Sequence, residues 1–127
     1  MEGDKPNIAE RSFAYALRVV KLYREVQRDE VGHVLGRQFL RSGTSIGANT
    51  HEAQGGQSKA DFIAKMYIAY KEARETSYWL RLIRESQVVS AEHLRDIADE
   101  TEQITRILSS ILLSAKRNGW NNKTPNS

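Results

Sequence analysis

Cysteine is absent from the 127-residue chain, and proline occurs only at Pro6 and Pro125. Without cysteine there is no disulfide and no thiolate zinc site, which fits a reducing cytoplasm. Since proline breaks helices, its absence between these two positions leaves nearly the whole chain free to be helical. No apolar run approaches the roughly 20 residues that a membrane-spanning helix needs. We therefore expect a helical, cytoplasmic protein with no membrane partner.

The net charge is also small, because 19 basic residues nearly balance 16 acidic ones and leave a net charge of +3. This balance permits a nucleic-acid partner without demanding one. The length suits one domain with a real core, and the polar first ten residues carry no secretory signal. We expect an N-terminal tail at 1–7, a folded domain at 8–119 and a disordered C-terminal tail at 120–127.

The spacing of apolar residues predicts four helices. The first spans about 8–28, and the second spans about 33–54. Gly32 is the expected turn residue between them, and Gly55-Gly56 ends the second helix. The apolar face expected for the first helix consists of Phe13, Ala16, Leu17, Val20, Tyr23 and either Val26 or Gln27.

The third and fourth helices begin at recognisable caps. Ser58 and Asp61 resemble a capping box, and Ser90 is a second N-cap candidate. Gly119 is the C-cap candidate of the fourth helix. The expected seam of that helix has 3-4-3-4 spacing and consists of Leu94, Ile97, Thr101, Ile104, Leu108, Ile111 and Ala115. Short connections between four helices predict an all-α, antiparallel, up-down-up-down four-helix bundle.

The stretch RSGTSIGANTHEAQGGQ, residues 41–57, has loop-like composition but a helical register. Its small residues Gly43, Gly47 and Ala48 would let a neighbouring backbone approach closely. Its polar stripe consists of Arg41, Ser45, Asn49 and Glu52. This stripe either faces water or forms a hydrogen-bonded contact with another protein surface. Because Glu52 is the only charged residue between Ser42 and Gln57, we favour the contact, and we expect Glu52→Ala to weaken an assembly more than Glu75→Ala.

The third helix has an apolar face beyond the one a small bundle needs. Ile68, Trp79 and Ile83 form this additional face. It predicts a further apolar partner, which is either a wide bundle core or another subunit.

Basic and aromatic residues alternate on the remaining face of the third helix, at Tyr67, Lys71, Arg74, Tyr78 and Arg81. The first helix adds Arg18, Lys21, Arg24 and Arg28. Such a pattern can hold a phosphate backbone and stack bases. The alternative is a solvated mixed-charge surface, since glutamates lie nearby in the sequence.

Enzyme motifs are nearly absent. Glu30 and His33 have the Glu-x-x-His spacing of di-iron bundles, but such sites need two of these motifs and two more carboxylates. The segment from Gly55 to Lys59 lacks the pattern of a phosphate-binding loop and is better interpreted as a helix–helix turn. We expect no catalytic residue, no metal, no cofactor and no small-molecule substrate.

The arrangement Gln38-Phe39-x-Arg41-x-x-x-Ser45-Ile46-x-x-Asn49-x-x-Glu52, followed by Ser58-Lys59-x-Asp61-Phe62, resembles the bacterial four helix bundle protein family. That family includes proteins encoded in intervening sequences of large-subunit ribosomal RNA genes, once labelled ribosomal proteins. The accessory variability determinant of diversity-generating retroelements is a relative. The likeness covers roughly Phe13 to Lys116.

The resemblance implies a homopentamer with a central channel and no known catalysis. In the retroelement relatives it implies an adapter that engages a reverse transcriptase and its RNA through a basic surface. The family signature falls on Gln38, Arg41, Ser45, Ile46, Asn49 and Glu52. All of these except Ile46 are expected to form a polar network that fixes helix packing or subunit register. Gly47 stands where the family often has proline, and this chain is less basic than the adapter.

We expect a non-enzymatic oligomeric scaffold or adapter for RNA or a nucleic-acid enzyme; the alternative is a module that binds RNA or DNA directly.

Overall fold

A computed structural model describes residues 7–117 and contains four helices. They are α1 (Ile8–Val26), α2 (Glu30–Gln54), α3 (Lys59–Glu85) and α4 (Ala91–Arg117). The predicted Gly119 cap, the C-terminal tail at 120–127 and all but the last residue of the N-terminal tail lie outside the described residues.

Short polar side chains start each helix. Asn7 accepts a hydrogen bond from the Glu10 amide, and Asp29 accepts one from the Gly32 amide, each at 2.8 Å. The predicted caps of α3 and α4 are confirmed, because Ser58 Oγ accepts from the Asp61 amide and Ser90 Oγ accepts from the His93 amide, both at 3.1 Å. Each cap satisfies an amide that has no partner within its own helix.

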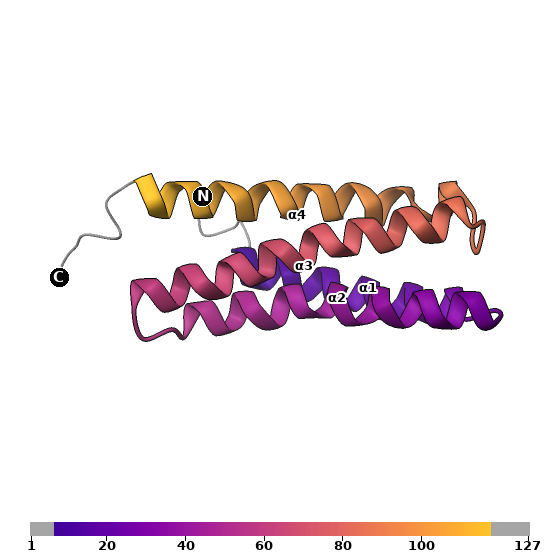
Figure 1. Ribbon diagram of the computed structural model, residues 1–127, viewed down its shortest axis with the longest axis horizontal. Coiled ribbons are helices and arrows are strands. Elements are labelled where there is room, and N and C mark those ends of the chain that lie inside the picture. The colour runs from indigo at the N-terminus through magenta and orange to yellow at the C-terminus, as the bar shows by residue number, and fades with distance from the viewer. Residues whose placement is uncertain (1–6, 118–127) are drawn as a thin grey trace.

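The helices form the predicted antiparallel up-down-up-down bundle (Figure 1). Each helix packs against the next one in the chain, and α4 returns to α1 along a looser seam. Consequently α1 lies diagonally across the bundle from α3. Among the helices of residues 7–117, none has the length and apolar character to cross a membrane.

The buried face of α1 shares only Val26 with the predicted face. Tyr15, Val19 and Val26 are almost fully buried, whereas Phe13 and Leu17 are each 58% exposed. The apolar residues of α1 spread over more than half its circumference, so either face could have been buried. Docking against α2 decides between them.

Glycines of α2 bring its backbone close to α1. A Cβ atom on Gly47 would lie 3.3 Å from the Ser12 carbonyl oxygen, and one on Gly43 would lie 2.9 Å from two methyl carbons of Val19. The predicted close approach therefore exists, and the partner is α1 of the same chain. Ala48, another small residue of this stretch, is exposed and takes no part.

The turn before α2 is shorter than predicted. Asp29 is the N-cap, so α2 begins at Glu30 and Gly32 lies inside its first turn. Gly32 is still needed, because a Cβ atom there would lie 2.0 Å from the Val26 carbonyl oxygen. The role of Gly32 is close approach to the end of α1, and the turn itself consists of the residues before Asp29.

The predicted seam of α4 is buried except at Ile111. There Leu112 is 8% exposed and belongs to the core, while Ile111 is only partly buried. A straight helix has 3.6 residues per turn and drifts by about 20° per heptad from a 3.5-residue repeat. This drift moves the buried position from Ile111 to Leu112.

Candidate functional site

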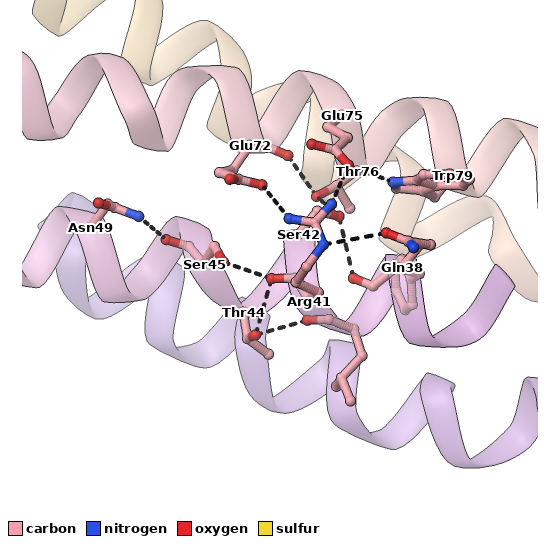
Figure 2. Close-up of polar contacts among 12 residues, drawn as sticks. Gln38, Arg41, Ser42, Thr44, Ser45, Asn49, Glu72, Glu75, Thr76 and Trp79 are labelled. Carbon is pink, nitrogen blue, oxygen red and sulfur yellow. Dashed lines mark hydrogen bonds and ion pairs between the residues drawn. The ribbon is translucent and has the colours of Figure 1, made fainter. Parts of the chain in front are cut away.

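Arg41 ties α2 to α3 at the centre of a polar cluster (Figure 2). Its guanidinium donates to Gln38 Oε1 at 3.3 Å on its own helix and to Glu72 Oε1 at 3.4 Å on α3. It also forms an ion pair with Glu75. Beneath it, the hydroxyls of Ser42 and Thr76 lie 2.8 Å apart, and both residues are fully buried.

The other members of the predicted stripe do not join this cluster. Ser45 Oγ donates to the Arg41 carbonyl at 2.7 Å, and Asn49 Nδ2 donates to the Ser45 carbonyl at 2.9 Å, so both bond back to α2. Glu52 pairs with Lys65 of α3 at 2.9 Å. Within the described chain, Arg41, Ser45 and Asn49 are thus linked in sequence through backbone carbonyls of α2, whereas Glu52 contacts α3 separately.

Glu75 makes two side-chain contacts in this cluster that the sequence did not predict. Its Oε2 accepts from Trp79 Nε1 at 3.0 Å and also pairs with Arg41. Glu52, by contrast, is 63% exposed. Glu75 is therefore unsuitable as the neutral reference for a Glu52 substitution.

The three residues of the additional α3 face have different surroundings. Ile83 is fully buried in the core of this chain and cannot supply surface for another subunit. Trp79 packs partly buried against the core, and Ile68 is 40% exposed. Of the two predicted explanations, the wide core accounts for Ile83.

A basic groove lies between α3 and α4. It has a volume of about 500 Å³ and continues into a second hollow of about 380 Å³ that shares four of its lining residues. Five exposed arginines line the two hollows: Arg74, Arg81 and Arg84 of α3, and Arg95 and Arg106 of α4. We call this surface the arginine groove. Asp99 and Glu102 are its acidic residues, so positive charge predominates.

Two of the five arginines of the groove have no ion-pair or hydrogen-bond partner within residues 7–117. Arg84 pairs with Glu85 at 3.1 Å, and Arg106 pairs with Glu102 at 3.4 Å. Arg74 lies over the ring of Tyr70, 6.0 Å from its centroid. Arg81 and Arg95 make no hydrogen bond or ion pair with any residue of the described chain. Their charges are available to an anion.

The sequence pattern found only part of this surface. Arg74, Arg81 and Tyr78 were predicted to contact nucleic acid, and all three line the groove. Arg84, Arg95 and Arg106 could not be predicted from a helical pattern, because such a pattern gives the face of one helix and not the residues that a neighbouring helix adds to it. The missing signal was the antiparallel turn near Val88: residues equally far from it in sequence, such as Arg81 and Arg95, come together across the two helices.

The basic residues of α1 and of the turn after it do not extend the groove. Arg18, Lys21, Arg24 and Arg28 are all exposed, but α1 is diagonally opposite α3. The basic residues of α1 and α3 were predicted to form one surface, but they lie on two separate surfaces. Only the α3 part gains further arginines from a neighbouring helix.

Two exposed tyrosines accompany the α3 arginines. Tyr67 is 52% exposed, and its ring stacks on Tyr70 with centroids 6.3 Å apart. Lys71 Nζ lies 5.5 Å from the centroid of Tyr67. Tyr78 is 57% exposed and meets the Trp79 ring edge-on at 5.0 Å. The predicted alternation of aromatic and basic side chains is thus present on one face of α3.

The resolved pKa shifts lie away from the groove. Arg11 of α1 donates to both carboxylate oxygens of Glu100 of α4, at 2.8 and 3.0 Å, and this hydrogen bonding lowers the pKa of Glu100. Burial raises the pKa of Tyr15 far above its usual value, which keeps the phenol protonated beside Thr101 at 2.6 Å. These groups hold α4 to α1.

Glu30 and His33, the residues with di-iron spacing, begin α2. His33 Nδ1 lies 3.1 Å from Gln27 Oε1. In residues 7–117, no group of three histidine or acidic side chains is placed so that it could hold a metal ion.

The fold and the groove define the class of this protein as an antiparallel four-helix bundle with a basic groove between its last two helices. At the level of family, residues 4–110 match the model of the 23S rRNA-intervening sequence proteins. The chain belongs to that family, as its resemblance predicted.

A solved structure supports the same assignment. The chain is similar to a protein of unknown function from the S23 ribosomal protein family of Bacteroides thetaiotaomicron VPI-5482. The two share 42% sequence identity and a TM-score of 0.79, over 84% of this chain and 98% of the other. A comparison with curated proteins finds no match.

Proposed function

We propose that this protein is a non-enzymatic scaffold or adapter that self-associates in the cytoplasm and contacts RNA through the arginine groove. The observation that carries the proposal is the groove itself. Five arginines from two helices line the groove, compared with two acidic residues. Arg81 and Arg95 have no ion-pair or hydrogen-bond partner in the described chain.

Phosphate chemistry favours such a surface. Arginine presents a planar fork of donors that matches phosphate oxygens, and release of counterions from a nucleic acid adds to the affinity. The groove runs between two long antiparallel helices, so its charges are repeated along a line. A linear polyanion fits this distribution better than a compact anion does.

Self-association is the second part of the proposal. The family resemblance supports a homo-oligomer with five copies as the expected number. Phe13 and Leu17 form an exposed apolar pair on α1, each 58% exposed, and large apolar side chains with this exposure often mark an interface. A second copy is the occupant we propose for this pair, because its position leaves the arginine groove free.

Binding measured against salt tests the contact with RNA. Wild type, Arg81→Ala/Arg95→Ala and Arg24→Ala/Arg28→Ala are titrated against one mixed-sequence RNA at several salt concentrations. The last variant loses the same charge from the C-terminal end of α1 and the turn after it. We expect the groove variant to bind more weakly, with a salt slope smaller by roughly 1.5 to 2, and the α1 variant to resemble wild type. Absence of RNA binding at low salt, or equal losses in both variants, would reject the proposal.

A further inference from the structure

We infer that the arginine groove and the adjoining α3 face bind single-stranded rather than double-stranded nucleic acid, with Tyr67 and Tyr78 as stacking platforms for bases. This inference rests on the proposed function and names the class of ligand for the same site. It follows from where the tyrosines lie relative to the basic side chains.

The two tyrosines bracket positive charge along α3. They are eleven positions apart, which corresponds to about 16 Å at 1.5 Å per residue. Lys71 and Arg74 lie between them in sequence, and Arg74, Tyr78 and Arg81 line the same hollow. A strand running along this face would place two separated bases on the rings and its phosphates on the cations between them.

Neighbouring side chains hold both rings. Tyr67 stacks on Tyr70 with an interplanar angle of 29°, and Tyr78 meets Trp79 at 76°. Both tyrosines nevertheless keep more than half of their surface exposed, at 52% and 57%. Rings that are already ordered lose less side-chain entropy when a base stacks on them.

Stacking on the tyrosines distinguishes single-stranded from double-stranded nucleic acid as the ligand of this surface. In a duplex the faces of the bases are covered by their neighbours, so a duplex can use only the arginines. Unpaired bases can also stack on tyrosine, a contact that tolerates any sequence because every base has a π-face. An acidic peptide, like a duplex, would use only the arginines.

The experiment compares three probes on the full chain by fluorescence anisotropy: a mixed-sequence single-stranded RNA, the same strand annealed to its complement, and polyglutamate. Each is titrated with wild type, Tyr67→Leu, Tyr78→Leu and the two matched phenylalanine variants. Phenylalanine keeps the ring and serves as the control. Both tyrosines are exposed, and circular dichroism verifies that the variants fold.

We expect wild type to prefer the single strand about tenfold or more, and each leucine substitution to weaken that binding by roughly tenfold. The phenylalanine variants should bind like wild type, and the duplex should be insensitive to every tyrosine change. Equal affinity for single strand and duplex, unaffected by leucine, would overturn the inference and leave the proposed function standing. Equal binding of polyglutamate and RNA would also overturn it, whereas no binding of any probe at low salt would reject both.

Discussion

At the scale of single residues, Arg41 of the family signature connects α2 to α3. Its guanidinium is shared between Gln38 on α2 and two glutamates on α3 (Figure 2). Its side chain is 48% exposed, so the contact is partly screened by solvent. Thr76 and Ser42 below it are fully buried and bonded to each other, which fixes the two helices in one register.

We expect Glu75→Ala to destabilise the protein by about 1 kcal/mol, because it removes acceptors from both Arg41 and Trp79. Glu52→Ala should cost less than about 0.5 kcal/mol, since its single ion pair is largely exposed. Urea unfolding of both variants decides the order. A larger loss for Glu52→Ala would mean that Glu52 has a partner outside the single chain.

The sequence predicted that Arg41 makes a polar contact but could not identify its partners. A pattern on α2 gives the face on which a residue lies. The partner depends on which turn of α3 comes opposite, and that is set by the length of the α2–α3 turn and by core packing. Glu72 and Glu75 could not be predicted as these partners, because nothing in α3 alone distinguishes a glutamate that meets an arginine from one that faces water.

At the scale of elements, α2 is a helix built for close approach. Gly43 and Gly47 were predicted to allow a neighbouring backbone to come near, and this is confirmed for α1. The identity of that neighbour could not be predicted, because the apolar residues of α1 support two faces. Of the predicted face, Phe13 and Leu17 stay exposed, whereas Val26 is buried.

Gly32→Ala tests this description of the α1–α2 contact. The new methyl group would meet the Val26 carbonyl oxygen, which belongs to the backbone and cannot simply rotate away. We expect a loss of about 2 to 3 kcal/mol despite the better helix propensity of alanine. Gly55→Ala is the matched control, because the nearest atom to its Cβ lies 3.9 Å away and its stability should be nearly unchanged. Equal melting temperatures for the two variants would contradict the close approach.

The seam between α1 and α4 should depend on pH. Hydrogen bonds from Arg11 hold the pKa of Glu100 below its ordinary value of 4.5. The unfolded chain therefore binds this proton more readily, so the stabilisation is present above about pH 4.5 and is lost as the pH falls through the lowered pKa. We expect the acid-induced loss of stability to be about 1 kcal/mol smaller in Glu100→Gln than in wild type. Identical acid profiles from urea unfolding would show that the pair contributes nothing.

At the scale of the whole molecule, the bundle topology creates the candidate site. The order of helices and their caps could be predicted from local pattern, since each helix carries its own signals. The arginine groove could be predicted only in part, because it joins positions on α3 and α4 that meet through the fold (Figure 1). The same topology separates the basic residues of α1 from those of α3.

Self-association is expected to depend on the exposed apolar pair of α1. Phe13→Lys/Leu17→Lys should shift the protein to a smaller species in sedimentation velocity at micromolar concentration. Leu113→Lys on α4, where a leucine of similar exposure at 54% is replaced, is the control and should sediment like wild type. A monomeric wild type would reject self-association. A shift caused by Ile68→Lys instead would place the interface on α3.

The central claim is that RNA lies between α3 and α4, and photo-cross-linking tests it most directly. RNA that contains 4-thiouridine is bound to the wild-type protein at low salt and irradiated, and the cross-linked peptides are identified by mass spectrometry. The account predicts cross-links within residues 67–84 of α3 and 91–106 of α4. Cross-links confined to α1, or none from an RNA that demonstrably binds, would contradict it.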